Sequence, residues 1–125
     1  MHTTKDCTFE RLLPNGLPIV AMEGQEVIIE LRGIEIVIPL SELYRDIFQI
    51  RLPATKRPLR CETESVLRDG HVRGRLFYFA WQDKSGDVWK DVAQLLLEQG
   101  LAKPAVGNYP EREEYLQYER NAPHR

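Results

Sequence analysis

The stretch that decides the fold runs from Glu26 to Ile38 and reads EVIIELRGIEIVI. It is rich in β-branched residues, which favour strands, and apolar and charged side chains alternate in its first half. After Gly33 the apolar positions shift by one, so that they fall on Ile34, Ile36 and Ile38. A glycine at the point where the alternation shifts predicts a bulge or a sharp bend, as found in strongly curved sheets.

Further elements are expected on both sides of this stretch, separated by turn sequences such as Asn15-Gly16 and Asp69-Gly70. Four more strands are expected at 8–13, 17–22, 59–67 and 74–82. Three helices are expected at 41–50, 88–99 and 110–121. Ser41 is expected to cap the first of these helices. The elements together predict an α+β domain, mainly β, that covers residues 1–125 and has a curled five-stranded sheet.

The sequence pattern also assigns side chains to faces. In the first helix, Leu43, Ile47 and Ile50 share one face, which is expected to be buried. In the aromatic strand 74–82, alternation places three rings on one face and Tyr78 on the other. The three rings, which are expected to lie in the core, are Phe77, Phe79 and Trp81.

The composition is that of an ordinary globular protein: 17 Lys and Arg, 19 Asp and Glu, and a net charge of −2 over 125 residues. No apolar run is long enough to span a bilayer and no secretory signal precedes the first strand, so a cytoplasmic protein without a membrane partner is expected. Cys7 and Cys61 lack metal-site spacing and are expected to be reduced thiols, with a single disulfide as the alternative.

The charges are unevenly distributed along the chain. Residues 51–75 hold seven Lys or Arg and three Asp or Glu, whereas the segments on both sides are acidic. A basic middle segment indicates either a surface for an anionic ligand or a solvated region of strand and loop.

Two segments of the chain resemble the staphylococcal-nuclease-like family. Glu30-Leu-Arg-Gly-Ile-Glu35 is similar to the third strand of that family. Gly74-Arg75, with the aromatic strand after it and Gln99-Gly-Leu-Ala-Lys103, resembles its second half. The resemblance covers residues 9–122 and implies an OB-fold barrel of five strands with about three helices.

Active members of this family cut DNA and RNA phosphodiesters with Ca²⁺. Carboxylates hold the cation, a glutamate activates water, and two arginines bind the phosphate. The position of the second arginine is kept as Arg75, and Glu35 occupies the position of one metal-binding aspartate. The first arginine, however, is replaced by Glu30, and Ile38 stands at the position of the general base. The other metal-binding aspartate falls on Gly16 or Leu17, so the resemblance implies a dismantled nuclease centre.

Two hypotheses of function follow. The first is a non-catalytic, nuclease-like OB-fold module that needs no cofactor and binds nucleic acid or protein, with Arg32, Arg75 and Tyr109 as the nucleic-acid-binding candidates. A protein partner would use the barrel edge and the acidic helix that starts at residue 110. The alternative is a divergent Ca²⁺-dependent nuclease in which Arg75 and Glu35 are the catalytic candidates and Glu35 and Glu30 the metal ligands.

These candidates also have structural interpretations. Glu30, Arg32 and Glu35 fit the exposed side of a strand, where charged residues are common. Arg75 fits an ion pair at the barrel edge, with Glu30 or Glu35 as its expected partner.

Overall fold

The computed structural model describes residues 3–37 and 40–122, so Ile38 lies outside the described residues. The chain is mainly β, and its described part contains three α-helices. The strands are β1 (Thr3–Leu12), β2 (Pro18–Met22), β3 (Gln25–Leu31), β4 (Ile34–Ile36), β5 (Leu59–Arg68), β6 (His71–Asp83), β7 (Gly86–Asp91) and β8 (Ala102–Pro104). The helices are α1 (Glu42–Asp46), α2 (Val92–Glu98) and α3 (Arg112–Arg120), with a π-helical turn at Ile47–Arg51 and a 3₁₀ turn at Pro53–Thr55.

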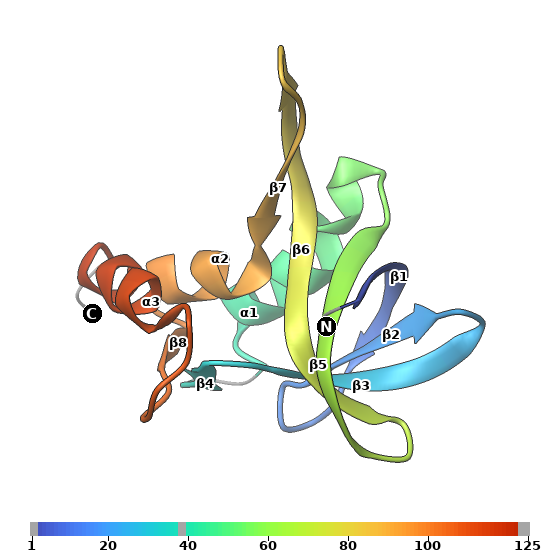
Figure 1. Cartoon of the computed structure of the whole chain (residues 1–125), viewed down its shortest axis with the longest axis horizontal. Coiled ribbons are helices and arrows are strands. Elements are labelled where there is room, and N and C mark those ends of the chain that lie inside the picture. Colours follow the sequence, from blue (N-terminus) through green and yellow to red (C-terminus); the bar gives the residue numbers. More distant parts are fainter. Residues whose placement is uncertain (1–2, 38–39, 123–125) are drawn as a thin grey trace.

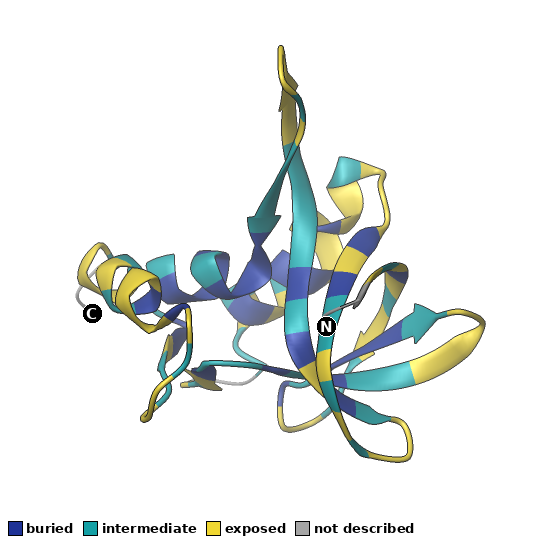
Figure 2. Ribbon diagram, in the orientation of Figure 1, coloured by how far each residue is buried: buried dark blue, intermediate teal, exposed yellow. Residues whose placement is uncertain are grey.

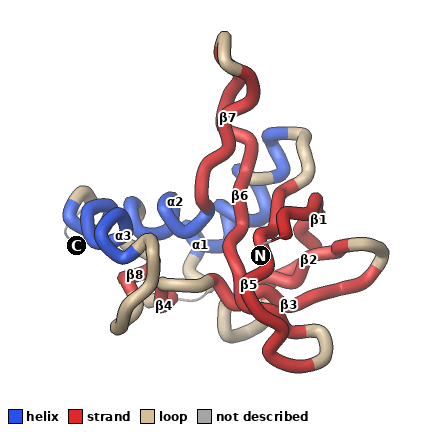
Figure 3. Tube along the Cα trace, in the orientation of Figure 1, coloured by secondary structure: helices blue, strands red, loops and turns tan. Residues whose placement is uncertain are grey.

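Six strands form one strongly curled sheet in the order β3-β2-β1-β5-β6-β7. Neighbours in this order run antiparallel, and β3 also pairs in parallel with β6, so that the sheet returns to its first strand. β4 and β8 form a separate antiparallel pair. Helices α2 and α3 lie beside this small pair, while the β6–β7 hairpin projects away from the rest of the molecule (Figures 1 and 3).

The bend expected at Gly33 is present, and the strand after it pairs with a different strand from those that pair with the strand before it. β3 ends at Leu31, Gly33 has φ +83°, and β4 begins at Ile34 to pair with β8 instead of the curled sheet. A left-handed conformation favours glycine because other residues meet a clash at Cβ. A Cβ on Gly33 would also lie 2.9 Å from ring carbons of Tyr109 and Tyr115.

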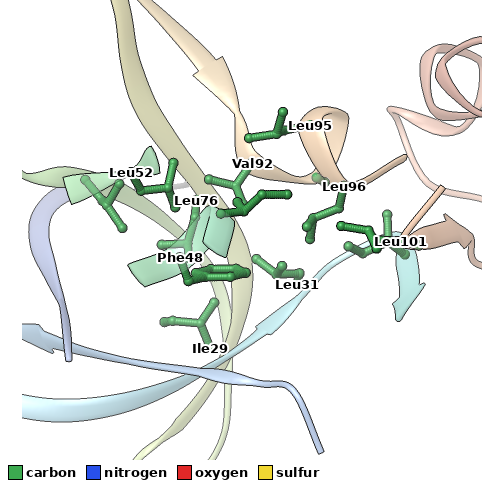
Figure 4. Packing of buried hydrophobic residues seen from close by; sticks show 14 of the residues in the cluster. Ile29, Leu31, Phe48, Leu52, Leu76, Val92, Leu95, Leu96 and Leu101 are labelled. Atoms are coloured by element: carbon green, nitrogen blue, oxygen red, sulfur yellow. The ribbon is translucent and has the colours of Figure 1, made fainter. Parts of the chain in front are cut away.

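The core lies between the curled sheet and the helices (Figures 2 and 4). Ile29, Phe48, Leu76 and Leu96 come from four different elements and are fully buried. Ser41 caps α1 as expected, because its hydroxyl accepts from the Tyr44 amide at 3.2 Å.

Ile50, expected on the buried face of that helix, is instead 61% exposed. The reason is the π-helical turn, in which the Leu52 amide donates to the Ile47 carbonyl five residues earlier. The wider turn changes which side chains lie on the buried face of this helical segment. Phe48 points into the core, and Ile50 points outward.

The helix expected at 88–99 begins four residues later than the spacing predicted. Val88 and Trp89 belong to β7, which pairs with β6, and the helix starts at Val92 with Asp91 as its cap. Hydrogen bonds to β6 satisfy the backbone there, and this tertiary pairing overrides the helical spacing of the apolar residues. The curled sheet has six strands and not the expected five, because β7 extends it beyond β6. β4 is the part of the expected strand 26–38 that follows Gly33, and it pairs with β8 outside this sheet.

The core assignment of the aromatic strand was also wrong. Leu76 is fully buried and Tyr78 packs against the core, so Phe77 and Phe79 lie on the opposite, outer face. Trp81, expected in the core, is 48% exposed. Alternation shows which residues share a face, but the pairing of Leu76 with buried Cys61 decides which face is buried.

Both cysteines are free, buried thiols on the paired strands β1 and β5. Burial raises the pKa of Cys7 from its ordinary value of 9.0 to about 12, and burial also raises the pKa of Cys61. No helix of residues 3–37 and 40–122 is long and apolar enough to cross a membrane.

We expect Gly33→Ala to destabilise the fold more than Gly24→Ala. Both glycines have a similar positive φ, +83° and +79°, but a Cβ on Gly24 meets nothing within 4 Å. Urea unfolding should show a loss of about 1 kcal/mol for Gly24→Ala, from backbone strain alone. Gly33→Ala should lose about 2 kcal/mol more, because the new methyl group clashes with Tyr109 and Tyr115. Equal losses would show that this contact is unimportant.

We expect both thiols to resist alkylation by iodoacetamide at pH 8 in the folded protein. The thiolate is the reactive form, and three pKa units reduce its fraction at Cys7 about a thousandfold relative to the unfolded chain. Because the unfolded thiol loses its proton first, the free energy of unfolding should fall as the pH rises from about 9 to about 12. Rates measured by mass spectrometry with and without urea test this; equally fast labelling in both would contradict it.

Candidate functional site: a buried arginine–carboxylate cluster

The two arginines singled out in the sequence lie together. Arg75 is in β6, and Arg32 follows β3, the strand that pairs in parallel with β6. The Arg32 amide donates to the Gly74 carbonyl at 2.9 Å. Because Gly74 directly precedes Arg75, this bond keeps the two arginines side by side on neighbouring strands. Arg32 donates to Oε1 of Glu111, and Nη1 of Arg75 forms an ion pair with the same oxygen at 3.2 Å.

Asp91 is the second carboxylate of this cluster. Its Oδ2 accepts from Arg75 Nη2 at 2.8 Å, from Nε at 3.2 Å and from the Tyr115 hydroxyl. Its Oδ1 accepts from the Ala93 amide at 2.9 Å and thereby caps α2. Asp91 is therefore bound on both oxygens while being 7% exposed.

The third carboxylate is Glu64, whose Oε2 accepts from Arg32 Nη1 at 2.9 Å. The side chains of Arg32 and Arg75 are only 12% and 20% exposed. Two guanidinium groups therefore face three carboxylates, those of Glu64, Asp91 and Glu111. The cluster carries an excess of negative charge and already occupies the donors with which an arginine would bind phosphate.

The ionisation of the cluster reflects this pairing. Burial lowers the pKa of Arg75, but the charge and hydrogen bonds of Asp91 outweigh it, so the pKa rises overall. Burial and the neighbouring Asp91 also raise the pKa of Tyr115. The arginine therefore stays charged and the tyrosine neutral, which is the arrangement that the hydrogen bonds require.

The expected partners of Arg75, Glu30 and Glu35, lie elsewhere. Glu30 Oε2 lies 3.8 Å from Nδ1 of His71, and Glu35 Oε2 lies 3.5 Å from Nζ of Lys103. Each contact crosses a strand pair, β3–β6 for Glu30 and β4–β8 for Glu35. The two candidate metal ligands are thus held by different neighbours on different sheets.

Glu30 lines an open pocket of about 240 Å³ beside Asn15 and Leu17. Glu35 is 52% exposed on the short β4–β8 pair. Within residues 3–37 and 40–122, no three His, Cys, Asp or Glu residues are grouped so that they could hold a metal ion.

Tyr109 shares a pocket of about 420 Å³ with Arg32, Glu64 and Arg73. Its hydroxyl donates to the Ala105 carbonyl at 3.1 Å, and its ring lies 6.0 Å from that of Tyr115. Burial raises the pKa of Tyr109. The structure therefore brings Glu30, Arg32 and Tyr109 to one hollow, whereas Arg75 does not line it.

Sequence reasoning missed Asp91 and Glu111 as members of the site. Asp91 immediately precedes the apolar residues of α2, a typical capping position, but the helix was expected to start earlier. Glu111 was assigned only to the acidic start of the last helix. Nothing in its local sequence indicates a bond to arginines that lie 36 and 79 positions earlier in the chain.

We expect Glu111→Gln to cost about 3 kcal/mol of unfolding free energy, because it leaves two buried guanidinium groups without their shared charge. Glu35→Gln is the matched control, since it removes an exposed ion pair with Lys103 and should cost less than about 1 kcal/mol. Chemical unfolding followed by circular dichroism measures both. A loss in Glu111→Gln no larger than that of the control would show that the cluster contributes nothing to stability.

The comparisons with known proteins leave the chain without an assigned family: no family model matches it, and no curated protein matches it either.

Proposed function

We propose that this chain is a non-catalytic binding module built on an OB-fold-like barrel of the staphylococcal-nuclease-like type. The strand connections support the barrel, because β1, β2, β3, β6 and β5 pair in a ring. The short β4–β8 pair and helices α2 and α3 attach to one side of this ring.

The proposal rests on one observation: Arg32 and Arg75 already form ion pairs with carboxylates of the same chain. Phosphodiester cleavage needs guanidinium groups free to bind the phosphate and its developing charge. Here Arg32 and Arg75 are bound to Asp91 and Glu111 inside the protein, and Arg32 also pairs with Glu64 at the surface. Opening these buried pairs would leave carboxylates unpaired, which costs several kcal/mol.

A phosphate approaching the cluster would also be repelled, since the three carboxylates outnumber the two arginines. The same ion pairs that stabilise the fold therefore oppose catalysis at this position. The chain then functions by holding a partner, nucleic acid or protein, on a surface outside the cluster.

We expect no cleavage when the protein is incubated at micromolar concentration with fluorescent single-stranded DNA or RNA and Ca²⁺, and the same result with a chelator. The physical reason is that neither arginine is free to bind the phosphate. Product analysis on a denaturing gel measures this, with an active nuclease as the positive control.

Cutting that requires Ca²⁺ and disappears in both Arg75→Ala and Glu35→Gln would overturn the proposal in favour of the Ca²⁺-dependent nuclease. Glu35→Gln is included because Arg75→Ala disturbs the buried cluster, whereas Glu35 is exposed. Thermal unfolding of each variant separates loss of activity from loss of fold.

A further inference from the structure

A row of aromatic rings lies on the outer face of the sheet, away from the core. Phe77 and Phe79 alternate along β6, and Trp89 lies directly opposite Phe79 on β7. The rings of Phe79 and Trp89 meet edge to face, with centroids 5.9 Å apart. All three rings are partly exposed.

An arginine guanidinium group lies close to each ring of this row. Arg57 lies 4.0 Å above the Phe79 ring, Arg60 lies 4.0 Å above the Trp89 ring, and Arg75 lies 4.8 Å from the Phe77 ring. We call the three rings, together with Arg57 and Arg60, the aromatic–arginine face. Stacked rings and guanidinium groups are the surfaces on which unpaired bases stack in single-strand-binding proteins.

Arg57 and Arg60 are accessible to a ligand, whereas Arg75 is largely buried. Arg57 pairs with Asp87 at 2.7 Å and Arg60 with Asp6 at 3.9 Å, but both arginine side chains are more than 40% exposed. Exposed ion pairs contribute little stability. A phosphate can therefore replace these carboxylates at low cost.

The chain segment that contains Arg57 and Arg60 is basic, which favours an anionic partner. Residues 51–60, which contain Arg57 and Arg60, include four Lys or Arg and no Asp or Glu, in a chain whose net charge is −2. The 3₁₀ turn of this segment packs against β6. The face continues onto the projecting β6–β7 hairpin, whose outer part is exposed (Figure 2).

We infer that the aromatic–arginine face binds single-stranded nucleic acid: Arg57 and Arg60 move off the Phe79 and Trp89 rings to bind phosphates, and bases stack on the ring surfaces that the two arginines cover in the free protein. The inference rests on the proposed binding function and names its partner. Stacking requires unpaired bases, so a duplex is expected to bind more weakly than a single strand. An acidic peptide could use the two charges, but it would leave the row of rings without a role.

The test measures fluorescence anisotropy of labelled 12-nucleotide dT and rU strands at several salt concentrations. The double variant R57Q/R60Q should raise Kd about tenfold and lower the salt dependence of binding, since each lost phosphate contact reduces the slope by about 1. F79L, which keeps an apolar side chain but removes the ring, should raise Kd about tenfold as well. R11Q is the matched control, because Arg11 forms a similar exposed ion pair, with Glu26 at 2.7 Å, and lies outside the face.

A second readout reports the stacking itself. The chain has two tryptophans, Trp81 and Trp89, so W81F leaves Trp89 as the only one. Binding should then quench Trp89 fluorescence with the same midpoint as the anisotropy change. Thermal unfolding of every variant confirms that the fold is retained.

The outcomes separate this inference from the proposed function. Cleavage of the strand on a denaturing gel would refute the non-catalytic proposal, whatever the affinity. An intact strand that does not bind at 100 μM protein and low salt, or that R57Q/R60Q and R11Q bind equally, would refute the inference alone. Equal displacement by polyglutamate and by dT strands would also refute it, because it would indicate a site for acidic protein.

Discussion

One buried carboxylate, that of Asp91, holds together the part of the molecule on which the candidate site depends. It ends β7, caps α2, and binds Arg75 of β6 and Tyr115 of α3. A buried charge is tolerated only when it is paired and hydrogen-bonded, so these four elements must keep their relative positions. Glu111 extends the same constraint to Arg32 at the end of β3.

Burial separates two kinds of arginine in this protein. Arg32 and Arg75 are largely buried, and replacing their carboxylate partners would leave charges unpaired in a medium of low polarity. Arg57 and Arg60 also have carboxylate partners, but solvent screens these pairs and makes them exchangeable. The first pair therefore serves stability, whereas the second pair is accessible from solvent.

Much of the fold follows from local sequence signals. The turns at Asn15-Gly16 and Asp69-Gly70 and the Ser41 cap lie where expected, because positive φ and side-chain capping are properties of a few neighbouring residues. The candidate site was less predictable. Arg32 and Arg75 could be named from the sequence, whereas their partners Asp91 and Glu111 are separated from them by 16 to 79 positions.

By itself, the sequence determined that the chain is mainly β, that it bends at Gly33, and that a helix begins after Pro110. Only the tertiary structure decided that Phe77 and Phe79 lie on the outer face, that Val88 and Trp89 form a strand, and which charges meet in the cluster. The physical reason is the range of the interactions. Turns and caps depend on adjacent residues, whereas the choice of buried face and the pairing of charges depend on which distant strands and helices pack together.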